Sequence, residues 1–457
     1  MAWIAFLMFL IVMLILLSGF PVALTLAGTA LIFAAFGILT GTFDPAFLET
    51  MPSRIYGIIN NVTLIAVPLF VFMGVTLERS KIAEDLLNTL SMLMSEVKGG
   101  LGVAVILVGA LMAASTGIVG ATVVTMGLLS LPTMLKAGYQ PSIATGTINA
   151  SGTLGQIIPP SIILVLLGDV LSSAYQQAQL KQNIFRPETV SVGDLFIGAL
   201  IPGLMLVGMY ILYVLILAKM KPSTMPKWGN KKSNMGRKEA FSDILKALIP
   251  SLMLIFAVLG SIIGGIATPT EAAGVGATGA LLLAFLRGKL SLAKLKEISR
   301  DTARFTSMVF LILIGASMFS LVFRGFGGDS AIQNFLTSMS SGPMMALAVV
   351  MVIMFCMGFV LDFIEITFVV VPIVGPALLA MGIDPLWLGI MIAINLQTSF
   401  LTPPFGFALF YLRGVAPKSV KTIDIYRGVL PFVAIQLIVL FMIALWPELA
   451  TWLPNQL

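Results

Sequence analysis

The stretch that decides the fold runs from Gly358 to Pro376 and reads GFVLDFIEITFVVVPIVGP. It is apolar enough to lie within a membrane, yet it contains Asp362 and Glu365. An ionised carboxylate at membrane depth costs at least about 2.5 kcal/mol, so such a residue normally faces a cavity or a cation. The stretch therefore predicts a functional interruption of a membrane segment rather than an ordinary spanning helix.

The composition of the whole chain agrees with a membrane location. Of its 457 residues, 58% are hydrophobic and only 10% are charged, whereas soluble domains have about 25% charged residues. A spanning helix needs about 20 mostly apolar residues, and many such runs occur. The first 20 residues lack a basic region and a small-residue cleavage site, so they predict a retained first helix. We expect an all-α polytopic membrane protein in a lipid bilayer.

The residue types that the chain lacks exclude several functions. There is one cysteine and no histidine, which excludes a disulfide within the chain, thiolate or imidazole metal sites and Ser-His triads. No G-x-x-x-x-G-K-[ST] loop is present, which argues against ATP-driven transport. We therefore expect no enzyme activity and no cofactor apart from a coupling ion.

The chain repeats itself at an offset of 244 residues. Both halves contain Gly-x-x-Pro, then 17 residues, then Pro-Pro. We therefore expect a first repeat at residues 1–218 and a second at 247–457, joined by a basic cytoplasmic linker at 219–246. The matching residues are Gly138 with Gly382, Pro141 with Pro385, and Pro159 and Pro160 with Pro403 and Pro404.

The basic residues fix the expected orientation. If each half has five crossings plus one re-entrant hairpin, 22 basic residues fall on one side. The side with the 22 basic residues is expected to be cytoplasmic. The net charge of +6 therefore reflects membrane orientation and not nucleic-acid binding. An odd number of crossings makes the two repeats inverted, as in many secondary transporters. The other side receives only Arg54, Lys181, Arg186 and Arg324.

Four symmetric helix breaks are predicted. Each half has a hairpin, at about 101–134 and 343–380, and a discontinuous helix, at about 142–172 and 385–411. Proline frees backbone carbonyls, and these with side-chain oxygens can replace the water shell of a hard cation such as Na⁺. The ion-binding candidates are Ser115, Thr116, Gly117, Thr122, Ser151, Gly152, Thr153, Asp362, Glu365, Asn395, Gln397, Thr398 and Ser399.

Half-helix N-termini at the same breaks would present N–H groups to an anionic solute. The substrate-binding candidates are Gly120, Pro159, Pro160, Thr402, Pro403 and Pro404.

Simpler interpretations of these residues remain open. Glycine and small polar residues also let membrane helices pack closely. One of the two carboxylates, Asp362 or Glu365, can cap a helix in a wet vestibule. Glu271 follows Thr268-Pro269-Thr270, which predicts a capping box at a helix start rather than an ion ligand.

The sequence resembles the large membrane subunit of TRAP transporters, the tripartite ATP-independent periplasmic family. The resemblance rests on Gly265–Ala273 (GIATPTEAA), on Ala150–Gly152 followed by Pro159–Ser161, on Arg413–Pro417 (RGVAP) and on Ile425–Pro431 (IYRGVLP). It implies sodium-driven uptake of small organic acids, carboxylates or sulfonates, through a bacterial inner membrane. It also implies a periplasmic substrate-binding protein, a small four-helix membrane subunit, and an elevator motion of the hairpins and broken helices.

Other functions fit parts of the pattern. A single-chain sodium- or proton-coupled organic-anion carrier of a related inverted-repeat family would share the architecture without partner subunits. A membrane-embedded enzyme would need a nucleophile–base pair or metal ligands, which the chain does not offer. A channel is a further alternative, but two symmetric hairpins suit alternating access better. No lysine or arginine is expected at membrane depth, so the sequence does not indicate the substrate.

Overall fold

The computed structural model describes residues 2–80, 82–227, 237–339 and 342–456. Within these ranges the regular structure is entirely helical, which confirms the predicted all-α class. Six of the described helices are long and apolar enough to cross a membrane, and the number rises to eight if each of two bent helix pairs is one span. Met1, the central part of the predicted linker at 228–236, and residues 81, 340, 341 and 457 lie outside the description.

The first half of the chain forms eleven α-helices and two short 3₁₀ turns in the described residues. They are α1 (Ala2–Leu17), α2 (Val22–Leu39), α3 (Ala46–Glu49), α4 (Met51–Ile59), η1 (Thr63–Ile65), α5 (Ala66–Arg79), α6 (Ile82–Leu93), α7 (Gly100–Thr116), α8 (Val119–Lys136), α9 (Pro141–Thr153), η2 (Leu154–Gln156), α10 (Ile162–Lys181) and α11 (Val192–Met220).

The second half, as far as it is described, also forms eleven α-helices. They are α12 (Arg237–Ile263), α13 (Pro269–Leu286), α14 (Leu292–Gly325), α15 (Gly328–Thr337), α16 (Pro343–Met357), α17 (Phe363–Val369), α18 (Val371–Ala380), α19 (Pro385–Leu401), α20 (Phe407–Val415), α21 (Thr422–Leu445) and α22 (Glu448–Thr451), followed by η3 (Pro454–Gln456). The last residues of the predicted linker, from Arg237 on, belong to α12.

Local sequence explains where several helices begin. Pro141 and Pro385 open α9 and α19 after an extended residue, because the fixed φ of proline suits the first helical position and disfavours a helical residue before it. Thr268 accepts a hydrogen bond from the Glu271 backbone N–H at 3.3 Å, while the Glu271 carboxylate accepts one from the Thr268 N–H at 2.8 Å. The predicted capping box at the start of α13 is therefore confirmed.

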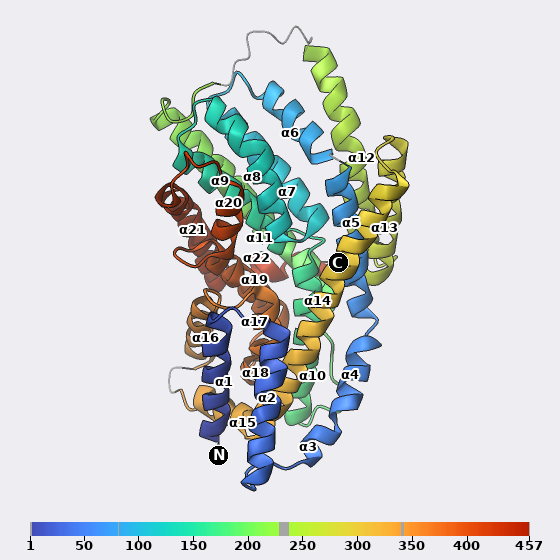
Figure 1. Ribbon diagram of the computed structural model, residues 1–457, viewed down its shortest axis with the longest axis vertical. Helices are drawn as coiled ribbons and strands as arrows, with labels where there is room; N and C mark the ends of the chain where they lie inside the picture. The colour runs from blue at the N-terminus through green and yellow to red at the C-terminus, as the bar shows by residue number, and fades with distance from the viewer. Residues whose placement is uncertain (1, 81, 228–236, 340–341, 457) are drawn as a thin grey trace.

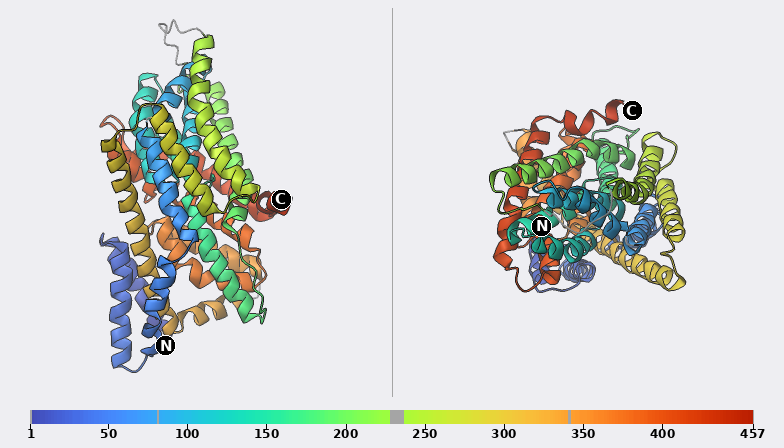
Figure 2. Two further views of the ribbon diagram at one scale, coloured as in Figure 1. Left: turned by 90° about the vertical axis from the view of Figure 1, so that its right-hand side faces the viewer. Right: turned by 90° about the horizontal axis from the view of Figure 1, so that it is seen from above.

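The helices form two groups, one towards each end of the long axis of the molecule (Figure 1). Helices α7, α8, α9 and α20 occupy one half of its length, and α16, α17 and α18 occupy the other. Helix α14 has 34 residues, or about 51 Å at 1.5 Å per residue, and runs obliquely through the middle of the long axis (Figure 2). It packs against α2, α5 and α17, so it connects the two halves of the structure.

Small residues allow the closest helix crossing. Helix α9 packs extensively on α21, and a Cβ atom added to Gly146 or Gly428 would collide with the backbone of the other helix. Membrane helices use such residues because backbones in lipid associate mainly through close packing.

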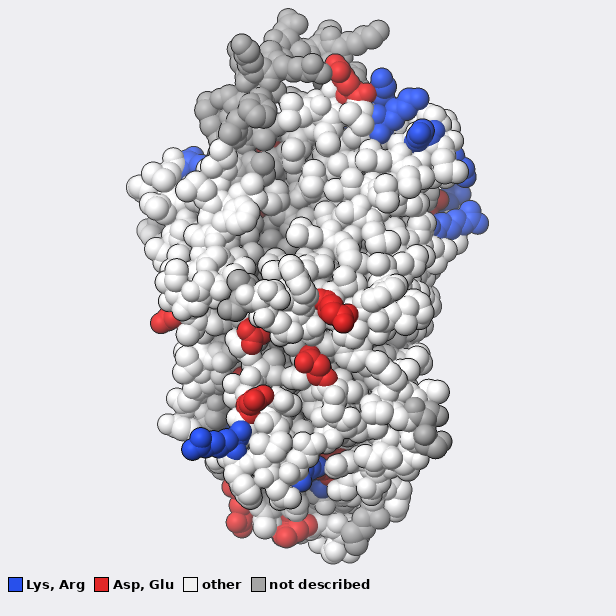
Figure 3. All heavy atoms as spheres, turned by 180° about the vertical axis from the view of Figure 1, so that it is seen from behind, with Lys and Arg blue, Asp and Glu red and all other residues white. Residues whose placement is uncertain are grey.

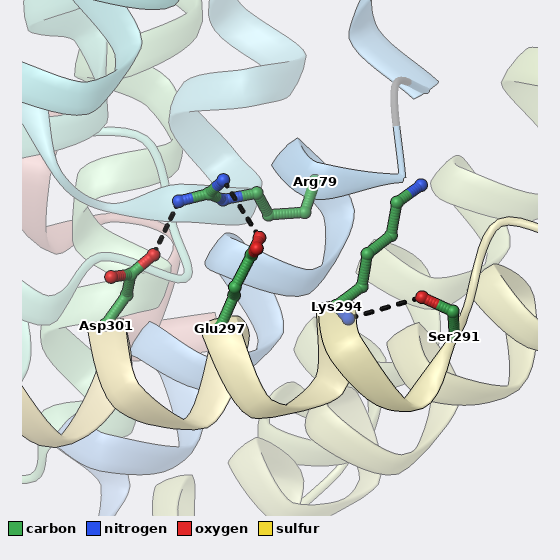
Figure 4. A network of polar contacts seen from close by, with 5 residues as sticks. All are labelled: Arg79, Ser291, Lys294, Glu297 and Asp301. Atoms are coloured by element: carbon green, nitrogen blue, oxygen red, sulfur yellow. Dashed lines mark hydrogen bonds and ion pairs between the residues drawn. The ribbon is translucent and has the colours of Figure 1, made fainter.

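Charged residues are concentrated at the surface. Arg79 at the end of α5 pairs with Asp301 of α14 at 2.7 Å and with Glu297 at 3.5 Å, and Ser291 caps the start of α14 (Figure 4). On the face opposite to Figure 1, several basic side chains gather towards one end of the molecule and few lie near the other (Figure 3).

Candidate functional site

A cavity of about 400 Å³ lies where the hairpins and broken helices come together. Residues from both halves line it, and α14 contributes one wall. The predicted breaks, far apart in the sequence, therefore share one space. The lining residues are Gly117, Ile118, Val119, Gly120, Ala121, Val124, Gln156, Ile162, Ile163, Leu166, Phe305, Met308, Asp362, Phe363, Ile364, Phe400 and Tyr411.

Three helix N-termini contribute to this lining: those of α8, α10 and α17. The N-cap residues of α8 and α10, Ile118 and Ser161, provide no side-chain hydrogen bond to the helix. Among the described residues, their first N–H groups therefore have no side-chain acceptor from the N-cap position. Free N–H groups and the positive end of the helix dipole attract anions, so this wall of the cavity suits a carboxylate.

The third N-terminus is capped by the two carboxylates that the sequence singled out. Asp362 Oδ1 accepts a hydrogen bond from the Phe363 N–H at 2.6 Å, and Glu365 Oε2 accepts one from the Asp362 N–H at 3.0 Å. The helix-cap interpretation therefore holds for both residues. Only Asp362 lines the cavity, while Glu365 is 6% exposed. Asp362 is thus the carboxylate available to a cation in the cavity.

Hydroxyl groups of the broken helices are buried and share one pattern of hydrogen bonding. Each donates its proton to a carbonyl about one turn earlier in its own helix. For the hydroxyls of α9 and α19 this leaves oxygen lone pairs as acceptors, at positions outside the described lining of the cavity. The distances are 2.9 Å for Thr122, 3.0 Å for Ser151, 2.9 Å for Thr153, 2.8 Å for Thr398 and 2.8 Å for Ser399.

Two glutamine side chains at the predicted helix breaks are buried with unsatisfied atoms. Gln156 and Gln397 have no exposed surface, and neither end of either amide has a hydrogen-bond partner among the described residues. Such groups cost about 1–3 kcal/mol each when left unpaired, so they favour a bound polar ligand. Gln156 lines the cavity itself. Asn395 instead donates to the Met351 carbonyl at 2.9 Å and ties α19 to α16.

The other candidates occupy two kinds of position. Gly117 and Gly120 line the cavity, and Gly117 turns the chain with φ of +61°. The remaining candidates lie outside the described lining: Gly152 packs on Val123, and Thr402 donates to the Thr398 carbonyl at 2.7 Å. Pro159, Pro160, Pro403 and Pro404 likewise do not line it. The side chains of Ser115 and Thr116 lie outside the described residues.

Sequence reasoning missed part of the lining. Gln156 belongs to a predicted break, yet the ion-binding candidates from that break are Ser151, Gly152 and Thr153. Phe305 and Met308 come from a helix with no break signal, and Tyr411 lies beyond the Pro403-Pro404 break, where no candidate was named. The sequence around these three residues carries no signal of a binding role, so only the folded arrangement reveals them.

The helical architecture occurs in solved membrane transporters. The Alcanivorax borkumensis YdaH transporter matches with a TM-score of 0.64 at 14% identity, over 89% of this chain and 89% of that chain. Neisseria gonorrhoeae MtrF, described as illuminating a class of antimetabolite efflux pumps, matches with a TM-score of 0.55 at 13% identity, over 87% and 83% of the two chains. The chain therefore shares its helical fold with these two proteins.

The family is shown by sequence. Residues 7–449 match the model of the tripartite ATP-independent periplasmic transporter, DctM component. This chain belongs to that family and is the large permease subunit of a TRAP transporter. It is consequently a transport protein and not an enzyme, as expected from the sequence.

Relatives that are named for different solutes have similar sequence identity to this chain. The C4-dicarboxylate TRAP transporter large permease protein DctM of Rhodobacter capsulatus is 29% identical, over 97% of both chains. The sialic acid permease protein SiaM of Vibrio cholerae is 30% identical and the ectoine permease protein TeaC of Halomonas elongata is 31% identical, each over 96% of both chains.

Proposed function

We propose that this chain is the translocating subunit of a sodium-coupled importer of small organic anions in the bacterial inner membrane. The observation that carries the proposal is the 400 Å³ cavity, where two uncapped helix N-termini and Asp362 occur together. An anionic solute suits the N–H groups of α8 and α10. A sodium ion beside Asp362 would offset its charge and draw on neighbouring carbonyl and hydroxyl oxygens.

The chemistry of the ion site supports Na⁺ over a transition metal. In the part of the chain that the structure describes, no group of three or more His, Cys, Asp or Glu side chains could hold a metal ion. Hard, weakly held cations are bound instead by carbonyl, hydroxyl and single carboxylate oxygens, as in broken helices of transporters.

The substrate class is a carboxylate or related oxyanion. The relatives are named for C4-dicarboxylates, sialic acid and ectoine, and all three solutes contain a carboxylate group. Uncapped N–H groups recognise that common group, while the aromatic and apolar lining, including Phe305, Phe400 and Tyr411, is available to contact the rest of the solute.

The motion that we propose is of the elevator type. The hairpins and broken helices, in two inverted repeats, would carry the cavity along the fixed helix α14. A periplasmic binding protein would deliver the solute, and a small four-helix subunit would support the scaffold in the bilayer. The family description, a tripartite periplasmic transporter, supports both partners.

Reconstitution into liposomes tests this function. We expect concentrative uptake of a radiolabelled C4-dicarboxylate, sialic acid or ectoine only with an inward Na⁺ gradient, the small subunit and the matching binding protein. A K⁺ gradient is the matched control. Uptake by the chain alone would favour the single-chain carrier, and uptake driven equally by a pH gradient without Na⁺ would contradict sodium coupling.

A further inference from the structure

A second cavity, of about 420 Å³, lies away from the one at Asp362. Helices α4, α10 and α14 and the α17–α18 pair line it. None of the candidate residues from the sequence belongs to it. Its polar lining includes Arg54, Asn61, Asp169, Gln177, Ser317 and Arg324.

The two arginines in this cavity are the important feature. Arg54 and Arg324 belong to the four basic residues expected on the periplasmic side, and they lie within electrostatic range of each other. Arg324 donates to Gln177 Oε1 at 2.8 Å, while its buried Nε–H has no hydrogen-bond partner among the described residues. Neither Arg54 nor Arg324 forms an ion pair with a described residue. Two guanidinium groups are thus held together without a paired carboxylate.

One acidic residue faces the same space. The Asp169 carboxylate accepts a hydrogen bond from Asn61 Nδ2 at 2.8 Å, and it forms no ion pair with either arginine in the described structure. The cavity therefore holds two positive charges against one negative charge. Guanidinium groups recognise planar oxyanions through paired N–H groups, so the excess charge favours a carboxylate or phosphate.

We propose that the Arg54–Arg324 cavity is an anion-binding site that receives an oxyanion group before it reaches the cavity at Asp362. Helix α14 lines both cavities, with Met308 at one and Ser320 at the other, and these residues lie about 18 Å apart along the helix. The anion site itself rests on the charges and the cavity; its place in the transport path also rests on the proposed function.

Cysteine labelling tests the anion site without any transport. In a Cys356→Ser background, Ser317→Cys places a thiol on the cavity wall, at a half-buried position. Purified protein is treated with anionic sulfonatoethyl or cationic trimethylammonium-ethyl methanethiosulfonate. We expect the ratio of anionic to cationic labelling rates to fall about tenfold in Arg54→Gln/Arg324→Gln, because charged clefts raise local counter-ion concentration by tenfold or more.

Matched variants separate charge from general damage. Lys181→Gln removes a basic residue from the same expected side, where it pairs with Gln333 at 2.9 Å outside the cavity, and should leave the ratio unchanged. Arg54→Lys/Arg324→Lys should keep the ratio but weaken protection by succinate, because lysine lacks the planar fork. An unchanged ratio in the double glutamine variant would overturn the proposal.

The source of the oxyanion is decided by two further arms. In phosphatidylcholine nanodiscs, millimolar succinate is added before the labelling reagent. If succinate slows the labelling of the thiol, the site binds a dissolved solute. Protection by phosphatidylglycerol alone, with no effect of succinate, would assign it to a lipid headgroup and overturn the role in solute transfer. If neither succinate nor phosphatidylglycerol slows the labelling of the thiol, the proposed anion site is overturned. If labelling behaves as expected while Na⁺-driven uptake is absent, the anion site stands and the proposed transport function fails.

Discussion

The two hairpin tips share a backbone plan and differ in chemistry. Helices α8 and α17 begin at Val119 and Phe363, which are 244 residues apart, the offset of the sequence repeat. The first tip turns at Gly117 and leaves the α8 N-terminus without a side-chain cap. The second places Asp362 on the α17 N-terminus and supports it with Glu365. The first tip therefore suits a bound anion, and the second supplies the negative charge that a cation needs.

The largest effect should come from removing that charge. Asp362→Asn keeps the shape and one carbonyl oxygen but removes the only negative charge of the second tip that lines the cavity, and leaves Glu365 behind it. We expect the Na⁺ concentration for half-maximal uptake to rise about 10- to 100-fold, the range for losing a hydrogen bond or contact to a charged group. Uptake against Na⁺ concentration in proteoliposomes measures it. An unchanged Na⁺ dependence would leave Asp362 as a helix cap only.

A smaller effect should follow from giving the first tip the charge of the second. Ile118→Asp would place a carboxylate on the N-terminus of α8, where Ile118 lines the cavity. Its charge would occupy the N–H groups that we assign to the solute, so we expect the KM for the anionic solute to rise about tenfold, within the range of helix-terminus interactions. Ile118→Asn is the neutral control. Equal KM values for the two variants would argue against an anion at this terminus.

The smallest effect should come from Glu365→Gln. Its carboxylate supports Asp362 from outside the cavity lining, through the backbone N–H bond of 3.0 Å. A glutamine oxygen can accept the same bond, so the Na⁺ requirement should rise by no more than about threefold, and the cap should lose less than the roughly 1 kcal/mol typical of a deleted cap. A rise as large as that of Asp362→Asn would show that both carboxylates hold the ion.

Local chemistry made much of this structure predictable. Proline at the start of α9 and α19, and the capping box at Glu271, depend on neighbouring residues alone, so the sequence indicates them directly. The two hairpin breaks were also visible, because glycine and carboxylates inside apolar runs need a physical reason. The inverted arrangement of the repeats remains a prediction.

The cavities depend on contacts between distant segments. Gln156, Phe305 and Tyr411 meet at one cavity, and Arg54 meets Arg324 at the other. No sequence pattern marks these residues as neighbours, because they do not correspond at the repeat offset of 244 residues. The sequence places Arg54 and Arg324 in separate loops, and the packing of α4 against α14 brings them together. The expectation that no lysine or arginine lies at membrane depth remains a prediction.

The long helix α14 makes part of the sequence intolerant of length changes. Each helical residue turns the chain by about 100° and advances it by 1.5 Å, so one inserted or deleted residue between Met308 and Leu313 would rotate the lining of one cavity away from the other. Substitutions can accumulate in this segment while its number of residues stays fixed, because that number sets how the residues that line the two cavities are oriented around the helix axis. Gaps in alignments of related permeases should therefore avoid these few residues, even where sequence identity is low.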